Sequence, residues 1–232
     1  MNAALVLAGG SGSRIGGERP KQYIKINGKA IILYTLETVF ACEKIERVRI
    51  VAAPEWQDRI LSHLKGREWA DKLDGFTEPG ETRQMSVYNG LKKMKEYLKD
   101  DDYILIQDGV RPLTTEKQIN DVIDAAHTAD GAVPMLPTKD TVYLCEDGEK
   151  ITGLLDRQTV FMGQAPEAFV LGKYFAANEA LLPYDILHVN GSAEPAVMAN
   201  MNIEIIPGDE KNFKITTQVD LDKFTDIKKG II

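Results

Sequence analysis

The sequence predicts an α/β fold in which a mostly parallel β-sheet is covered by helices on both faces. Short apolar runs rich in β-branched residues alternate along the chain with segments of helical periodicity. Parallel neighbours need a crossover connection, usually a helix, so this alternation favours a parallel sheet. A chain of 232 residues with 44% hydrophobic content is long enough to bury such a sheet.

The strands are expected where apolar runs are bounded by turn residues. The run YILIQDG (103–109) stops on an acid. A strand that ends on an acid is typical of the edge at which an open α/β sheet binds its ligand. The expected strands cover residues 4–9, 47–54, 103–109, 131–136 and 202–208.

The helices are expected from apolar spacing and from capping residues. In 83–99, Val87, Leu91, Met94 and Leu98 recur at helical spacing. Thr115 with Gln118 resembles a capping box, and Thr217 with Asp220 suits the start of the last helix. Further helices are expected over 30–41 and 55–66, and the alternation resumes in 169–182 and 213–224.

Residues 138–160 interrupt this alternation. Strand-like residues flank an Asp147-Gly148 turn, which predicts a β-hairpin inserted into the α/β domain. Since an isolated hairpin is marginally stable, we expect it to pack on a second subunit. The chain is therefore expected to form one domain over 1–232, with 138–160 as a protruding arm for dimerisation.

Charge and composition restrict the partners. The net charge of −7 argues against a nucleic-acid-binding surface. The apolar runs fall short of the ~20 residues of a membrane span. The two cysteines lie far apart and lack metal-ligand spacing. We expect a cytoplasmic protein whose partners include neither nucleic acid nor a membrane.

The first strand runs into a glycine-rich segment, LAGGSGSRIG, followed by PKQ. Bare backbone beside cations suits an anionic ligand, because backbone N–H groups can cradle phosphate. A dinucleotide-binding pattern fails at Ile15, and a Walker A pattern fails at Pro20. The segment predicts a phosphate site of another kind.

These motifs and five others resemble those of cytidylyltransferases that act on 2-C-methyl-D-erythritol 4-phosphate or ribitol 5-phosphate. The others are GETRQMSVYNGL, IQDGVRP, VPMLPTKDTV, DRQTVFMGQAPEAF and NFKITTQVDL, which occur in the family's order. The resemblance spans nearly the whole chain. It implies a Rossmann-like fold, CTP as a substrate, Mg²⁺ as a cofactor and a homodimer formed through the arm.

The resemblance also implies roles for individual residues. Catalytic roles fall to Arg14, Lys21 and Lys214, which would neutralise charge on the phosphates. Nucleotide binding falls to Leu7, Ala8, Gly9, Gly10, Gly12, Gly80, Glu81, Arg83, Ser86, Asp108 and Gly109. Asp108 is also the expected metal ligand and an acceptor-binding residue, together with Arg157, Ala165 and Asn190.

The remaining expectations concern the acceptor side. Arg157 is expected to reach the acceptor phosphate across the dimer interface, and Arg111 to brace the Asp108 loop. Ala165 and the Asn190-Gly191 pair stand where the family commonly has Thr and Thr-Asp. These departures leave open a cytidylyltransferase that uses another polyol phosphate as its acceptor.

Two further classes of protein remain open. One is a Rossmann oxidoreductase, and the other is a nucleotide-binding protein that has lost catalysis.

Overall fold

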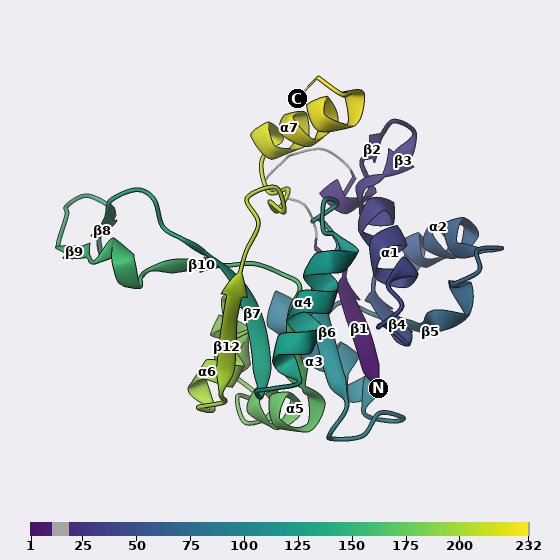
Figure 1. Ribbon diagram of the computed structural model, residues 1–232, viewed down its shortest axis with the longest axis horizontal. Coiled ribbons are helices and arrows are strands. Elements are labelled where there is room, and N and C mark those ends of the chain that lie inside the picture. The colour runs from purple at the N-terminus through teal and green to yellow at the C-terminus, as the bar shows by residue number, and fades with distance from the viewer. Residues whose placement is uncertain (11–18, 232) are drawn as a thin grey trace.

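A long twisted sheet forms the centre of the molecule (Figure 1). The computed structural model describes residues 1–10 and 19–231. Within those ranges the sheet has eight strands in the order β10-β7-β11-β6-β1-β4-β5, with β12 also paired to β7. Their bounds are β1 Asn2–Leu7, β4 Arg47–Val51, β5 Leu73–Thr77, β6 Tyr103–Asp108, β7 Gly131–Pro137, β10 Phe161–Gly163, β11 Glu167–Val170 and β12 Ile203–Pro207.

The sheet is mostly parallel, as predicted. Strand β1 pairs in parallel with β4 and β6, β4 with β5, and β7 with β12. The antiparallel strand β11 lies between β6 and β7, and β10 also runs against β7. The sequence analysis did not predict β5 or β11. The apolar residues of β5 are interrupted by Gly75, and the last residues of β11 merge with the helical pattern that follows.

Helices cover both faces of the sheet, which confirms the predicted layers (Figure 1). Because side chains alternate along a strand, Leu105 packs on one face, whereas Ile104 and Ile106 pack on the other. Helices α1 (Ile31–Ala41), α2 (Pro54–Leu64) and α4 (Glu116–Ala126) pack with Leu105. Helices α3 (Arg83–Met94), α5 (Leu171–Glu179) and α6 (Glu194–Met198) cover the opposite face. Helix α7 (Gln218–Lys229) packs Phe224 in a separate cluster with Ile31.

The predicted helix starts are confirmed, and one predicted end is wrong. Thr115 and Thr217 each form a capping box, with Gln118 and Asp220 respectively. Helix α3 ends at Met94 rather than at residue 99. Beyond it the chain turns, and the Lys99 N–H donates to the Asp102 carboxylate at 2.7 Å.

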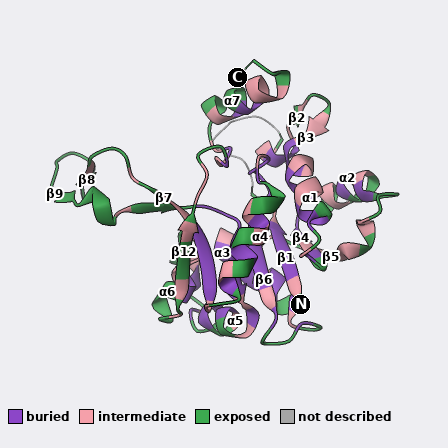
Figure 2. Ribbon diagram, viewed as in Figure 1, coloured by how far each residue is buried: buried purple, intermediate pink, exposed green. Residues whose placement is uncertain are grey.

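The arm is a hairpin that projects from the body of the molecule, and most of it is exposed (Figures 1 and 2). Its strands are β8 (Val142–Leu144) and β9 (Gly153–Leu155), and Gly148 in the turn has φ +75°. The predicted hairpin is confirmed. The division of the chain into one domain with a dimerisation arm stays a prediction.

The base of the arm is tied to the segment that follows β12. The Gln164 side chain donates to the Asp209 carbonyl and accepts from the Asp209 N–H, each at 3.0 Å. The Asn212 amide donates to the Ala165 carbonyl at 2.8 Å. These bonds hold the start of β11 against the loop that carries Lys214.

The remaining elements are short. They are β2 (Lys25–Ile26), β3 (Lys29–Ala30) and the 3₁₀ turns Lys21–Tyr23, Ala70–Lys72, Arg157–Thr159 and Asp185–His188. None of the helices in the described part of the chain combines the length and the apolar character that a membrane crossing requires.

Candidate functional site

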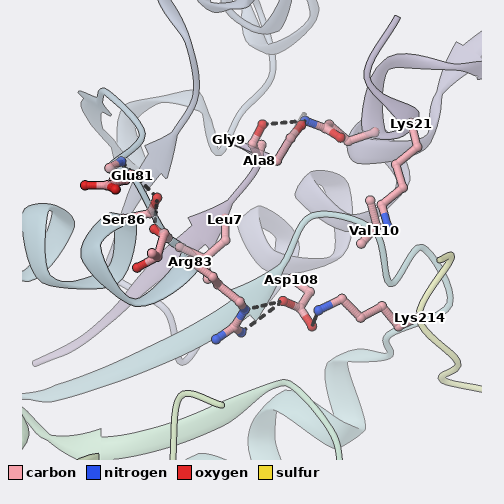
Figure 3. Close-up of a pocket in the computed structure, with 14 residues that line it drawn as sticks. Leu7, Ala8, Gly9, Lys21, Glu81, Arg83, Ser86, Asp108, Val110 and Lys214 are labelled. Carbon is pink, nitrogen blue, oxygen red and sulfur yellow. Dashed lines mark hydrogen bonds and ion pairs between the residues drawn. The ribbon is translucent and has the colours of Figure 1, made fainter. Parts of the chain in front are cut away.

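A cavity of about 500 Å³ opens where β1 and β6 end, at the carboxyl edge of the parallel strands. This is the edge at which open α/β sheets bind ligands. Figure 3 shows side chains from β1, α3, β6 and the segment before α7 around one space. The lining residues are Leu7, Ala8, Gly9, Gly10, Lys21, Gln22, Gly80, Glu81, Thr82, Arg83, Ser86, Asp108, Val110 and Lys214.

The described start of the glycine-rich segment, Gly9 and Gly10, lines the cavity. A Cβ on Gly9 would lie 2.5 Å from the Pro79 ring, so a larger residue would push the loop out of place. The Gln22 side-chain amide donates to the carbonyls of Ala8 and Gly10, both at 2.7 Å. Sequence reasoning missed this role, although Gln22 belongs to the quoted PKQ motif.

The start of α3 forms another wall of the cavity. Thr82 caps the helix by accepting from the Met85 N–H, and the Gly80 N–H donates to the Ser86 hydroxyl at 3.0 Å. A Cβ on Gly80 would lie 2.6 Å from that of Met85. Only glycine fits there without moving the helix, which explains the glycine of the GETR motif.

Asp108 is the electrostatic centre of the cavity. It is 4% exposed, and its carboxylate meets Arg83 Nη2 at 3.0 Å and Lys214 Nζ at 3.1 Å. Figure 3 shows the two cations approaching it from opposite sides. Burial alone would raise the pKa of Asp108, but Arg83, Lys214 and Arg111 outweigh burial and hold that pKa well below its usual value. Asp108 is therefore ionised at neutral pH.

Arg111 braces the Asp108 loop, as predicted. Its Nε lies 3.2 Å from Asp108 Oδ2, and its Nη1 donates to the Asn212 carbonyl at 2.6 Å. The arginine thus joins the end of β6 to the segment that carries Lys214.

The donor set fits poorly with a protein-bound magnesium ion. Within the described ranges, no group of three or more His, Cys, Asp or Glu side chains could hold a metal. Both oxygens of Asp108 already meet cations, which would repel Mg²⁺. This arrangement disagrees with the prediction that Asp108 is a metal ligand.

The structure brings together most of the predicted nucleotide site. Lys21, Lys214 and nine of the predicted nucleotide-binding residues line the cavity: Leu7, Ala8, Gly9, Gly10, Gly80, Glu81, Arg83, Ser86 and Asp108. Gly109 does not line it and packs behind, with its N–H bonded to the Leu7 carbonyl at 2.9 Å. Gly12 and Arg14 lie outside the described residues.

Of the predicted acceptor residues, only Asp108 is among those that line this cavity. Arg157 is exposed at the arm, with Nη1 bonded to the Lys139 carbonyl at 3.3 Å. Ala165 is buried, and Asn190 is exposed before α6, where its N–H donates to Glu194 at 2.7 Å. That Arg157, Ala165 and Asn190 bind the acceptor stays a prediction.

A cavity of this composition at the carboxyl edge of a mostly parallel sheet is typical of α/β proteins that bind a phosphate-bearing ligand such as a nucleotide. The family model "IspD: 2-C-methyl-D-erythritol 4-phosphate cytidylyltransferase" matches residues 2–227. The chain belongs to this family of nucleotidyltransferases.

Curated relatives carry two names. A protein of Neorickettsia sennetsu named 2-C-methyl-D-erythritol 4-phosphate cytidylyltransferase is 38% identical over 226 residues, covering 97% of this chain and 95% of the relative. A second relative, from Streptococcus agalactiae serotype V, is named ribitol-5-phosphate cytidylyltransferase. It is 33% identical over 225 residues, which cover 97% of this chain and 93% of the relative.

A solved structure supports the same placement. The 4-diphosphocytidyl-2C-methyl-D-erythritol synthase of Anaerococcus prevotii has a TM-score of 0.82 and 25% identity, covering 99% of this chain and 96% of that one. These similarities do not favour a dehydrogenase or an inactive nucleotide-binding protein.

Proposed function

We propose that this protein transfers the cytidylyl group of CTP to a sugar-alcohol phosphate and releases pyrophosphate. An oxygen of the acceptor phosphate forms a bond to the α-phosphorus of CTP. The bond from that phosphorus to the oxygen bridging the α- and β-phosphates breaks, and the electron pair leaves with pyrophosphate. The acceptor phosphate is already an anion at neutral pH, so positioning and charge neutralisation supply most of the catalysis.

The observation that carries this proposal is the Asp108 cluster beside the glycine-rich segment. Lys214 Nζ is held 3.1 Å from Asp108 and still lines the cavity, with its side chain 33% exposed. Lys21 lines the same cavity. Two lysines on different segments can therefore approach one triphosphate, and cations aimed at the phosphoryl group stabilise charge that develops in the transition state.

The test is pyrophosphate release with CTP, Mg²⁺ and either 2-C-methyl-D-erythritol 4-phosphate or ribitol 5-phosphate. Turnover with at least one acceptor is expected, and it should require CTP rather than ATP, GTP or UTP. Lys21→Ala is the variant expected to slow this turnover, because Lys21 lines the cavity. Lys25→Ala is its matched control, because Lys25 is exposed on β2. No turnover with either acceptor, or a preference for a purine nucleotide, would refute the proposal.

The choice of acceptor is a separate proposal. The relatives' names point to the two polyol phosphates, and Ala165 supplies no side-chain hydroxyl. Losing a hydrogen bond to a buried polar group costs ~1–3 kcal/mol, so Ala165→Thr is expected to improve the acceptor KM about tenfold if a hydroxyl is missing. A poorer KM would indicate a different acceptor geometry.

We also propose a homodimer in which the partner's arm approaches this cavity. The arm exposes apolar side chains, including Tyr143 at 54%, Ile151 at 66% and Leu154 at 65%. An apolar surface of this kind favours a protein interface. Arg157 on the same arm offers a planar guanidinium that can grip an acceptor phosphate.

Mg²⁺ and the compartment complete the proposal. Since Asp108 is engaged by cations, we propose that Mg²⁺ binds to the triphosphate oxygens and neutralises part of their charge. The two free cysteines, Cys42 and Cys145, suit a reducing cytoplasm. Chelation of Mg²⁺ is expected to abolish turnover, and unchanged turnover in its absence would refute the requirement.

A further inference from the structure

Glu167 is a buried acid that the proposed reaction does not use. It is 8% exposed at the start of β11, and its Oε2 atom is buried with no hydrogen-bond partner among the described residues. Such an oxygen destabilises an ionised carboxylate, because a buried charge needs partners on both oxygens. Its place in the fold therefore needs an explanation.

The register of the sheet places Glu167 on the same face as Asp108. Glu167 is paired with Ile106, and Asp108 follows two residues later on β6. Since side chains alternate along a strand, these three side chains share the face that α3 covers. The first residue of α3 is Arg83, which therefore lies near both acids.

Arg83 is held on two sides. Its Nε and Nη2 atoms donate to Asp108 Oδ1 at 3.4 and 3.0 Å. Its Nη1 donates to the Ser192 hydroxyl at 2.6 Å. An arginine has five N–H groups, so these three bonds leave two N–H groups for a ligand in the cavity.

Ser192 joins Arg83 to Glu167. Because its oxygen accepts from Arg83, its own proton is free to point toward another acceptor, and it interacts with the Glu167 carboxyl. Arg83 and Ser192 are thus hydrogen-bonded beside the cavity, and Ser192 lowers the pKa of Glu167, which lies on the same face of the sheet as Asp108.

We propose that Glu167 is a positioning residue that acts on Arg83 through Ser192, and that its protonation controls how strongly Arg83 attracts an anionic nucleotide. When Glu167 is neutral, Arg83 faces the charge of Asp108 alone. When Glu167 is ionised, a second negative charge opposes the nucleotide. The readout on nucleotide binding rests on the proposed function, whereas the readout on unfolding does not.

The charges around Glu167 allow it to titrate near neutral pH. Burial raises its pKa to about 7, against the opposing influence of Arg83 on α3 and of Ser192. Asp108 on β6 raises the pKa further, and Arg111 after β6 lowers it. Tyr174 on α5 also interacts with Glu167, and because burial and Glu167 raise the pKa of Tyr174, it stays neutral.

Ionisation should weaken nucleotide binding by about tenfold, the effect of one charge about 10 Å away at an effective dielectric constant of about 20. The expected result for the unmodified protein is a CTP Kd that rises as the pH increases from 6 to 8. By linkage, CTP binding near pH 7 should also raise the pKa of Glu167 and draw in protons. Calorimetry in buffers of different ionisation enthalpy measures that uptake.

Glu167→Gln replaces the acid by a neutral side chain of the same shape. This variant is expected to keep the low-pH affinity up to pH 8 and to take up fewer protons than the unmodified protein. Glu167→Met is the second variant, because an apolar side chain can replace the unbonded Oε2. Glu204→Gln is the matched control, since Glu204 is exposed on β12. A Kd that rises equally in the unmodified protein and in both Glu167 variants would overturn the proposal.

Unfolding supplies a readout that does not depend on CTP. Because the pKa of Glu167 is raised in the folded state, ionisation destabilises the fold progressively as the pH rises from about 5 to above 7. The difference in Tm between Glu167→Gln and the unmodified protein should therefore grow in favour of the variant by about 5–10 °C as the pH rises from about 5 to about 8. A pH-independent difference would overturn the proposed titration. If CTP does not bind at all, the proposed function fails and this measurement still decides the role of Glu167.

Discussion

Replacing Asp108 by asparagine removes the one charge that three cations share. In the folded protein the Asp108 carboxylate meets Arg83, Arg111 and Lys214 at 3.0–3.2 Å. The asparagine side chain would keep the shape and one acceptor oxygen, but it would leave the three cations facing one another. We expect Asp108→Asn to lower the stability of the folded protein.

The exposure of each partner sets the size of the effect. The Arg111 side chain is 9% exposed, so that pair is buried, and breaking a buried pair costs about 3 kcal/mol or more. The side chains of Arg83 and Lys214 are 30% and 33% exposed, so solvent screens them and each pair contributes about 0.5 kcal/mol. The expected loss is about 4 kcal/mol at pH 7, or a fall in Tm of about 8–16 °C for a chain of this size.

The pH dependence of this loss has a definite sign. The pKa of Asp108 is depressed in the folded state, so its contribution is present above the unfolded pKa of about 4. It fades as the pH falls from there toward the lower folded value. Urea unfolding of both proteins between pH 3 and pH 8 should therefore show a difference that shrinks below about pH 4.

The control for this measurement is Asp124→Asn, since Asp124 is an exposed partner of Lys44. A loss below about 1 kcal/mol at pH 7 for Asp108→Asn, or a loss equal to that of the control, would contradict the argument that Asp108 is the centre of the cation cluster.

Three further predictions concern the cavity and the arm. Lys21→Ala and Lys214→Ala should each lower kcat by about a hundredfold, which is the scale for losing one charged donor, and change the Tm by only a few degrees. A large fall in Tm with a normal kcat would show that these lysines are structural. Gly80→Ala would place a Cβ 2.6 Å from that of Met85, and we expect kcat/KM for CTP to fall about a hundredfold. A normal kcat/KM for Gly80→Ala would refute the argument that only glycine fits between the cavity and the start of α3. Mixing the Arg157→Ala and Lys21→Ala proteins, each expected to be impaired alone, should restore part of the turnover if one arm serves the partner's cavity. No recovery after subunit exchange would argue against it.

The layers of the fold could be predicted because each signal is local. Thr115 and Thr217 identify their helices through residues three positions away, and the apolar runs of β1 and β6 are nearly uninterrupted. Strand β11 escaped prediction because it is short and leads directly into α5, so a strand and a helix form one apolar run.

The candidate site was predictable where a motif carries it and not where distant residues meet. Gly9, Gly10 and Gly80, which line the cavity, could be predicted from their motifs. The sequence did not predict that Arg83, Arg111 and Lys214 all contact Asp108, since Arg83 and Lys214 are far apart in the chain and only the folded sheet brings them to one carboxylate. Glu167 gave no signal, because its role depends on the register between β11 and β6.

The hydrogen bonds of Gln164 and Asn212 have a mechanical consequence. Gln164 lies between β10, at the base of the arm, and β11, and its side chain is doubly bonded to Asp209. Asn212, which lies two residues before Lys214 in the chain, donates its side-chain amide to the carbonyl of Ala165, next to Gln164. These bonds therefore couple the position of the base of the arm directly to the backbone two residues before Lys214, a lysine that lines the cavity.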